Sequence, residues 1–478
     1  MINKIKENGV VYTPKYIVEM ILDQAQYTKN EIIKKHVIDN SCGDGAFLVE
    51  IVKRYIESYF LLNKKENDTS DLIFQLETYI HGIEIDELEV TKCKKNLDNI
   101  ALTYGLKNIN WDVNQGDALK ISKYFGKIDY VLGNPPYVRI HNLKENLANI
   151  KKMNFANCGM TDLFIIFYEL GLDMLNNNGK LVYITPSSVF NSLAGKKFRN
   201  YVINSKLLTS IIDLKHFQAF ENFTTYTAII MLEKQNKKDY INYYEFDSKN
   251  FKKIFIDILS YNDFFLDNKW YFGNLNQLKK MKNIINSTTK NLNIDVKNGF
   301  ATLSDKKFIK NDFPFNSKFI YPIIKGSTEK WYKVFFPYDK AGNIVDFKLF
   351  EKPLQEYLLS NETELKKRSI EKASKWYSFG RSQGIKDFWK EKICINNLIR
   401  DKQNIKLINI KPGEGVYSGL YIIGNIKLSD IKKVLISDEF INYVSILGKY
   451  KNGGYYTYSS NDLKKYICYK LFNNNQEN

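Results

Sequence analysis

The stretch DYVLGNPPYVRI, residues 129–140, places two adjacent prolines directly after an apolar run. Proline donates no backbone N–H to a sheet and disfavours helical geometry in the residue before it. A strand through Tyr130–Leu132 must therefore end at Gly133, and Asn134–Tyr137 must form a stiff loop beyond it. An amide, two prolines and an aromatic ring are thus held rigidly at a strand end, which indicates a functional position rather than a simple turn.

The chain around this loop, from Val37 to Leu232, alternates short apolar runs with segments of helical period. Helices are expected through Leu48–Phe60, Glu87–Leu102 and Leu163–Leu175. Strands are expected in HVID, YIHGIEID, IDYVLG, GKLVYITP, LLTSIIDL and TYTAIIMLEK. This alternation predicts a doubly wound α/β sheet, whose ligands bind beyond the carboxyl ends of the strands.

Three acidic residues follow three successive strand-like segments: Asp39, Glu84 and Asp117. Gly43 and Gly45 allow a tight turn after the first, but the stretch matches neither GxGxxG nor a P-loop, so a phosphate ligand is poorly supported. Asp39 suits an ammonium group, Glu84 two ribose hydroxyls, and Asp117 an adenine amine. A ligand with these three parts and no phosphate is S-adenosylmethionine.

The order of the motifs is similar to that of a known family. YTPKYIVEMIL (residues 12–22) precedes DNSCGDGAF, GIEID, GDAL, GNPPY, GKLVYITPSSVF and AFENFTTYTAI. The chain resembles the gamma-class (NPPY) N6-adenine-specific DNA methyltransferases of restriction–modification systems. NGFATLSDKKFI (298–309) and WYSFGRSQGI (376–385) resemble segments of the target-recognition domain in that class.

The resemblance implies a Rossmann-like methyltransferase sheet of about seven strands, the last antiparallel, with a separate distal α+β target-recognition domain. It also implies that the target base is flipped out of the duplex. The catalytic positions it implies are Asn134, Pro135, Pro136, Tyr137 and Phe220. The implied cofactor-binding positions are Tyr12, Thr13, Pro14, Asp39, Ser41, Cys42, Gly43, Glu84, Ile85, Asp117, Ala118 and Asn134. Two positions depart from relatives: Asp39 stands where Glu is common, and Phe223 where some have Lys.

The chemistry of the reaction explains the loop at Asn134. An adenine amine is a poor nucleophile because its lone pair is delocalised into the ring. The Asn134 side-chain oxygen and the Pro135 carbonyl can each accept one amine hydrogen, on a backbone that proline holds fixed. Tyr137 offers a face for the flipped base, worth about 1–3 kcal/mol, and Phe220 is expected to form the second wall. No covalent intermediate is needed, so Cys42 is expected to pack rather than react.

Charge divides the chain into two parts. Residues 1–250 carry 31 Lys and Arg against 30 Asp and Glu, whereas residues 251–478 carry 39 against 23. This asymmetry favours a polyanion-binding distal domain, here double-stranded DNA. We expect a catalytic domain over 1–240, a linker or hinge over 241–290, and a basic DNA target-recognition domain over 291–478.

Within the basic part, GRSQG (380–384) places Arg381 and Gln383 on a glycine-flanked loop. Arginine can read guanine and glutamine adenine in the major groove, and either can bind phosphate instead. Lys306 and Lys307 are expected to bind phosphate or to be solvated.

Composition limits the remaining possibilities. The five cysteines, Cys42, Cys93, Cys158, Cys394 and Cys468, form no CxxC pair, which suggests free thiols and no metal site. The chain has no apolar run of the ~20 residues that a membrane span needs, and its first residues lack a signal-peptide core, so a cytoplasmic protein is expected.

Other functions stay open at this point. An NPPY methyltransferase can act on RNA or protein glutamine, and N4-cytosine methylation uses a similar loop. The chain can also be a catalytically silent DNA-binding specificity subunit. About a dozen residues precede the first cofactor motif, so a nuclease domain is not expected there, and the chain is expected to modify without cutting. The methylation either protects DNA from a cognate restriction endonuclease, a further candidate partner, or is that of an orphan methylase.

Overall fold

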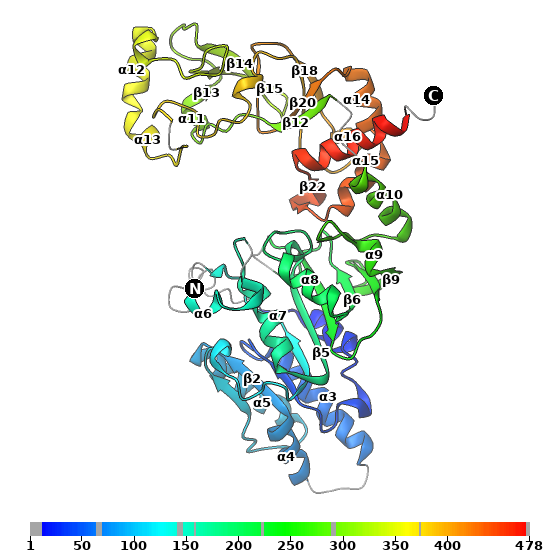
Figure 1. Cartoon of the computed structure of the whole chain (residues 1–478). Helices are drawn as coiled ribbons and strands as arrows, with labels where there is room; N and C mark the ends of the chain where they lie inside the picture. Colours follow the sequence, from blue (N-terminus) through cyan, green and yellow to red (C-terminus); the bar gives the residue numbers. More distant parts are fainter. Residues whose placement is uncertain are drawn as a thin grey trace. The chain divides into compact units, whose positions relative to one another are not determined.

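The computed structural model describes residues 12–63, 69–140, 147–156, 159–220, 224–287, 293–371 and 374–474. The chain divides into two compact units, which meet in sequence between Lys279 and Lys280. Figure 1 follows the elements of both units along the chain.

A single large sheet forms the centre of the first unit. Within the described residues its strand order is β3-β2-β1-β4-β5-β7-β6-β8-β9. The first five strands in this order are parallel, and β7 pairs antiparallel with both β5 and β6. The strands are β1 (Val37–Asp39), β2 (Ile80–Glu84), β3 (Asp112–Gln115), β4 (Ile128–Gly133), β5 (Leu175–Pro186), β6 (Leu208–Asp213), β7 (Thr227–Glu233), β8 (Tyr240–Asp247) and β9 (Lys252–Ser260).

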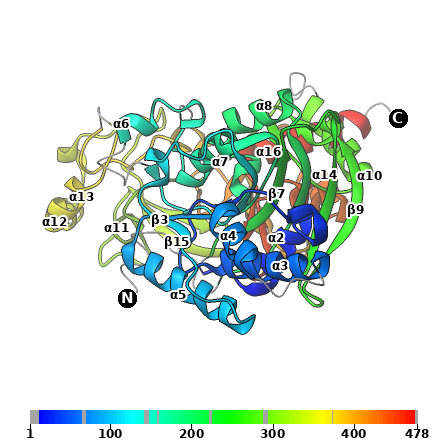
Figure 2. The same cartoon turned by 90° about the horizontal axis from the view of Figure 1, so that it is seen from below.

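Helices cover both faces of this sheet, as the alternating pattern predicts (Figures 1 and 2). Tyr130 and Leu132 of β4 belong to one core with apolar residues of α2, α3, α4 and α5. Val131 points to the opposite face because successive side chains of a strand alternate. There α7 packs closely, through Gly171. The helices are α2 (Lys15–Gln24), α3 (Ala46–Leu62), α4 (Ser70–Tyr79), α5 (Glu87–Thr103), α6 (Leu147–Ile150), α7 (Leu163–Met174), α8 (Lys196–Asn204) and α9 (Tyr261–Phe264).

The strand order reverses between β1 and β4. β1 pairs in parallel with β2 on one side and with β4 on the other, so that Val37 lies beside both Ile80 and Tyr130. In doubly wound sheets the helices on the two sides of such a reversal diverge and leave a crevice at the carboxyl ends of the strands. The loops after β1 and β4 therefore lie at the position where ligands of this fold class bind.

Most of the segment 241–290, expected to be a linker, instead belongs to the first unit, which runs to Lys279. β8 and β9 add two strands to the sheet, β10 (Phe265–Leu266) and β11 (Lys269–Trp270) form a small hairpin, and α10 (Leu275–Asn286) follows. Ile241, Tyr243 and Phe246 of β8 are buried. The charged residues around β8 suggested a boundary, but alternate apolar side chains reach the core, as in a strand with one face buried.

The second unit combines three small sheets with helices, the mixture expected of an α+β domain. One sheet has the order β12-β20-β16-β18, another β13-β15-β14-β19, and a third β17-β22-β21. The strands are β12 (Ile294–Asn298), β13 (Ile309–Lys310), β14 (Ile320–Lys325), β15 (Lys330–Phe335), β16 (Lys392–Ile395), β17 (Leu398–Ile399), β18 (Leu407–Ile410), β19 (Gly415–Tyr417), β20 (Leu420–Gly424), β21 (Tyr450–Lys451) and β22 (Tyr455–Thr457). The helices are α11 (Asp305–Phe308), α12 (Lys352–Ser360), α13 (Glu362–Lys366), α14 (Leu428–Leu435), α15 (Asp438–Ile446) and α16 (Ser460–Asn474).

Gly171→Ala tests the close packing of α7 on the sheet. A Cβ at this position would lie 2.4 Å from Leu181 Cδ1 and 2.9 Å from the Tyr183 hydroxyl, so the helix or these buried side chains must shift. Overpacking a core costs about 1–3 kcal/mol, which exceeds the gain of about 1 kcal/mol from replacing glycine in a helix. We expect the thermal unfolding midpoint to fall by several degrees, and Thr91→Ala on the exposed face of α5 to leave it within about one degree. An unchanged midpoint for Gly171→Ala would show that α7 is loosely packed.

Candidate active site

The carboxyl ends of β1 and β4 bring Asp39 and Asn134 together. Asp39 is 1% exposed, and its carboxylate lies against the backbone of Gly133, where a Cβ atom would come within 2.7 Å of Asp39 Oδ1. The backbone N–H of Ser41 donates to the same oxygen at 3.0 Å. Because Gly133 has no side chain, the acid at the end of β1 can occupy the space directly beside the start of the NPPY loop.

Burial changes the protonation of Asp39. Loss of solvent contact raises the pKa of this carboxyl to about 8, the negative charge of Glu84 acts in the same direction, and the bond from Ser41 N–H opposes both. The carboxyl is therefore mostly neutral at pH 7 in the unliganded protein. A cationic group placed against it would favour the ionised form.

The Asn134 amide is oriented by one bond and leaves an acceptor unused. Its Nδ2 donates to Thr13 Oγ1 at 3.2 Å. Its Oδ1 is shielded from solvent and has no hydrogen-bond partner among the described residues. The Ser41 hydroxyl donates to the Asn134 backbone carbonyl at 3.3 Å and so joins the loop after β1 to the loop after β4. A buried acceptor without a partner is costly, which marks Oδ1 as a position for a ligand donor.

The carboxylate of Glu84, at the end of β2, is held by backbone groups. Oε2 accepts from Gly43 N–H at 2.9 Å, and Oε1 accepts from the N–H groups of Ile85 and Asp86 at 2.8 and 3.0 Å. A carboxylate offers about four lone-pair directions, so about one remains for a ligand hydroxyl. The expected contact to two ribose hydroxyls therefore requires one of these bonds to be released.

The other expected cofactor residues lie around the same strand ends. Asp117 follows β3 and accepts from Leu119 N–H at 3.0 Å, as the N-cap of a short 3-10 helix that begins at the buried Ala118. Ile85 and Tyr12 are large apolar side chains that are 64% and 54% exposed. Pro14 is the N-cap of α2, and its carbonyl accepts from Ile17 and Val18.

Cys42 packs in the core, as expected. It is 5% exposed and lies beside Cys93, whose thiol is its hydrogen-bond partner. That bond and burial raise the pKa of the Cys42 thiol well above its usual range, so a thiolate is not available at neutral pH. Cys93, Cys394 and Cys468 are also buried and free, whereas Cys158 lies outside the described residues.

Tyr137 and Phe220 are neighbours, but they do not form two parallel walls. Their ring centroids lie 6.1 Å apart with the planes at 72°, and Phe220 is 3% exposed. The Tyr137 hydroxyl donates to the Ile184 carbonyl at 3.1 Å, which places the ring against β5. An edge-to-face contact leaves no slot for a flat base between the rings, so this expected arrangement is absent from the structure as it stands. Phe223 lies outside the described residues.

Two residues of the site were missed by sequence reasoning. Gly133 leaves room for the Asp39 carboxylate because it has no side chain. The glycine directly before Asn134 in the sequence could have indicated this close approach. Asn40 is 1% exposed and accepts from the Tyr183 hydroxyl at 2.9 Å, which ties the loop after β1 to β5.

A cavity of about 530 Å³ lies between α2, α3 and α5, and Thr13, which belongs to the predicted site, is one of its lining residues.

In the second unit, Arg381 and Gln383 are exposed, but one donor nitrogen of each is bound to the protein. Arg381 Nη1 donates to the carbonyls of Ser369 and Gly380 at 2.7 and 2.8 Å. Gln383 Nε2 donates to the carbonyl of Gly299. The GRSQG loop is therefore fastened to the NGFATLS segment, and both side chains have structural bonds that base reading would have to replace.

The two lysines of SDKKF differ. Lys307 forms an ion pair with Glu364 at 3.0 Å, whereas Lys306 is exposed. Arg368 is also structural, because its guanidinium donates to the carbonyls of Thr302, Leu365 and Trp376.

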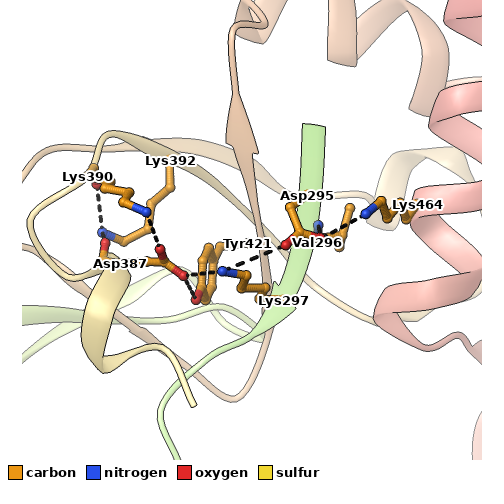
Figure 3. Close-up of polar contacts among 8 residues, drawn as sticks. All are labelled: Asp295, Val296, Lys297, Asp387, Lys390, Lys392, Tyr421 and Lys464. Atoms are coloured by element: carbon orange, nitrogen blue, oxygen red, sulfur yellow. Dashed lines mark hydrogen bonds and ion pairs between the residues drawn. The ribbon is translucent and has the colours of Figure 1, made fainter. Parts of the chain in front are cut away.

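A buried carboxylate fixes the segment that follows the GRSQG loop (Figure 3). Asp387 accepts from Lys297, Lys390 and Tyr421 at 2.7, 2.8 and 3.0 Å. Burial opposes its ionisation, but these donors outweigh burial and lower the pKa of Asp387 to about 2. The buried Lys392 donates to the carbonyls of residues 387, 388 and 390, and burial lowers its pKa to about 8. These contacts bury Lys392 and pair Lys297 and Lys390, whose side chains stay partly exposed, with an internal carboxylate.

The described residues contain no helix that is both long and apolar enough to cross a membrane. Nor do His, Cys, Asp and Glu side chains in this part of the chain gather in a group of three or more that could hold a metal ion.

Part of the chain matches a known family. Residues 46–220, which include Glu84 at the end of β2 and the loop after β4 but not the loop after β1, match the family described as Eco57I restriction-modification methylase. The chain is 25% identical to the Type II restriction enzyme and methyltransferase RM.Eco57I of Escherichia coli, over 92% of this chain and 55% of that protein. It is 30% identical to the Type II methyltransferase M.BstVI of Geobacillus stearothermophilus, over 48% and 42%. The chain thus spans about half the length of these relatives.

Solved structures show the same fold. The Type IIL restriction-modification enzyme MmeI in complex with DNA has a TM-score of 0.62 at 15% identity, covering 93% of this chain and 63% of that one. The DNA complex of DrdV has a TM-score of 0.54 at 12% identity, covering 87% and 49%. By sequence, residues 46–220 match the Eco57I restriction-modification methylases, and by fold the chain is similar to restriction-modification enzymes.

Proposed function

We propose that this protein is a site-specific DNA methyltransferase that transfers a methyl group from S-adenosylmethionine to the exocyclic N6 of a flipped-out adenine in duplex DNA. The observation that carries the proposal is the Asn134 amide at the end of β4. Thr13 orients its Nδ2, and its buried Oδ1 has no partner among the described residues. An amine hydrogen of the target base is the donor that this acceptor suits.

The residues at the strand ends fit S-adenosylmethionine. Asp39 offers a carboxyl to the ammonium group, Glu84 an oxygen to a ribose hydroxyl, and the exposed Ile85 an apolar surface to the adenine ring. A Cβ at Gly43 would meet nothing within 4 Å, so the loop after β1 leaves open space beside these groups. The cofactor supplies a methyl group on a positively charged sulfur.

The protein's own task is to prepare the amine. Asn134 Oδ1 accepts one amine hydrogen and the Pro135 carbonyl the other, which directs the nitrogen lone pair away from the ring. Because Thr13 and the prolines hold these acceptors in place beforehand, little reorganisation is needed at the moment of transfer. The target base must approach from the side on which the loop after β1 leaves open space. Tyr137 is the aromatic ring proposed to face the base there.

DNA is the proposed substrate for two reasons. The relatives that the chain matches are named as Type II methyltransferases, and MmeI and DrdV were solved as DNA complexes. The distal part of the chain also carries the excess of positive charge, as a phosphate-binding domain requires. We propose the second unit as the target-recognition domain, and protection from a cognate restriction enzyme as the purpose of the modification.

The direct test is to incubate the protein with labelled S-adenosylmethionine and duplex DNA, structured RNA or a protein extract, and then to identify the labelled nucleoside or amino acid. N6-methyladenine from the duplex supports the proposal. Label in N4-methylcytosine, RNA or glutamine would overturn the substrate assignment. Cofactor binding without any transfer would indicate a catalytically silent specificity subunit.

Asn134→Ala removes the acceptor for the amine. We expect the single-turnover methylation rate to fall by about 10²–10³-fold, as for the loss of one preorganised polar group. The affinity for S-adenosylmethionine, measured by calorimetry, should change little. A variant that keeps its rate would show that Oδ1 does not contact the base.

Thr13→Val removes the bond that orients Asn134 and keeps the side-chain shape. We expect the rate to fall about five- to tenfold, because one such bond contributes about 1 kcal/mol. Thr13→Ser should restore most of the rate, since it keeps the hydroxyl. If serine and valine are equally slow, packing of the Thr13 methyl group rather than its hydrogen bond is what matters.

Asp39 should make cofactor binding depend on pH. Its raised pKa means that the carboxyl must lose a proton before it accepts from the ammonium group. We expect the affinity for S-adenosylmethionine to rise with pH by up to about tenfold per unit below pH 8, and to fall at higher pH as the α-ammonium group of the ligand, with a pKa of about 8, loses its proton. Asp39→Asn should bind more weakly and without this rise. A pH profile shared by both proteins would assign the titration to another group.

A further inference from the structure

Leu303, in the second unit, combines two properties that rarely occur together. It lies between β12 and α11, its backbone is left-handed with φ +56°, and its side chain is 46% exposed. The left-handed region is strained for a residue with a Cβ atom, and bulky apolar residues rarely adopt it. Among the described non-glycine residues with positive φ, only Leu303 and Phe251 are apolar. Phe251 has ring partners in Tyr16, Phe217 and Phe246.

The residue before Leu303 imposes this conformation. Thr302 is fully buried, and its carbonyl accepts from Gly380 N–H at 3.1 Å and from Arg368 Nη1. Its hydroxyl donates to Asp305 and accepts from Ser304 N–H. Four bonds therefore fix the turn on both sides of Leu303. A strained backbone persists only where its surroundings over-determine it, and such positions are concentrated at functional sites.

The GRSQG loop (380–384) packs against the Leu303 side chain. A Cβ at Gly380 would lie 2.2 Å from Leu303 Cγ, so the inner half of the side chain occupies the space that this glycine leaves. Arg381 N–H donates to the Ala301 carbonyl at 3.1 Å and joins the two loops further. The outer half of the leucine is left in solvent, where burial would be favourable.

The charged neighbours suit a nucleic acid on this side. Arg381 and Lys306 are exposed around the leucine loop, whereas the Arg381 Nη1 and Gln383 Nε2 donors are bound to carbonyls of the loops themselves. The two loops therefore hold out rigidly an apolar tip that has the exposed cations Arg381 and Lys306 beside it, together with the exposed Asp305. In the major groove of DNA, the apolar feature that such a tip can contact is the C5-methyl group of thymine.

We propose that Leu303 is a specificity-determining residue that packs on the methyl group of a thymine within the recognition site. The inference rests on the proposed function, and it assigns base reading to a side chain that carries no hydrogen-bonding group. Because the target of methylation is an adenine, the site contains at least one thymine on the opposite strand. The contact predicts a preference for thymine over uracil at one position.

The test uses the full chain and a duplex that contains the mapped site. Replacing each thymine in turn by deoxyuridine removes only the methyl group. We expect one replacement to lower the affinity of the wild-type protein about five- to tenfold, the value of about one buried methyl group. The same replacement should have no effect on Leu303→Asn, which should bind both duplexes equally and weakly. The slope of affinity against salt should stay unchanged, because no phosphate contact is lost.

Leu303→Asn is chosen because it should weaken DNA binding without destabilising the fold. Asparagine adopts the left-handed conformation readily, so Leu303→Asn should unfold at the same temperature as the wild type or higher. Leu349→Asn, at another exposed leucine of the second unit, is the matched control and should leave the uracil effect intact.

The proposal is overturned if no thymine replacement affects the wild type, or if Leu303→Asn shows the same uracil effect as the wild type. It is also overturned if Leu303→Asn loses stability and keeps its thymine preference, which would make the leucine purely structural. Failure of the proposed function is seen separately, in the wild type, as absence of methyl transfer to duplex DNA.

Discussion

The approach of the Asp39 carboxylate to the backbone of Gly133 is the constraint on which the candidate site depends. β1 and β4 are neighbours at the place where the strand order reverses, and the two loops beyond them must share one small space. A side chain at position 133 would occupy the place of Asp39 Oδ1. The acid and the Asn134 amide can therefore meet only because a glycine ends β4. The same contact excludes water from Asp39, which is the cause of its raised pKa.

Much of the first unit was predictable because its signals are local. The two prolines end β4 at Gly133, and α5 begins where Asp86 caps it by accepting from Leu88 N–H. The alternation of strands and helices predicted the sheet and its helical layers. β8 was missed because its stabilisation comes from pairing with β6 and from burial of alternate side chains, whereas its composition is that of a surface segment. β9 was missed because it is mostly exposed and is held by pairing with β8.

For the polar residues of the second unit, the sequence could not predict which partners their side chains bind. Arg381 and Gln383 have the side chains that base reading needs, but one donor nitrogen of each binds carbonyls of the protein. Gly299, which accepts from Gln383, is 84 residues away in sequence, and the position of a backbone carbonyl cannot be read from composition. Likewise Lys297 and Lys390 count toward the positive charge of the chain although each is paired with the buried Asp387. Net charge therefore favours a polyanionic partner, but it could not indicate which side chains would face it.

The three backbone bonds to the Glu84 carboxylate have a consequence for how its role can be measured. Gly43 N–H belongs to the loop after β1, so this one side chain links the ends of two strands in addition to its proposed contact with the cofactor. Removing it would release the loop and delete the proposed ligand contact at the same time. The two losses are coupled, and a single substitution cannot apportion them. A thermodynamic cycle would combine a substitution at Glu84 with a cofactor analogue that lacks a ribose hydroxyl. Only such a cycle would separate the free energy of the contact to the ribose from the free energy of ordering the loop after β1.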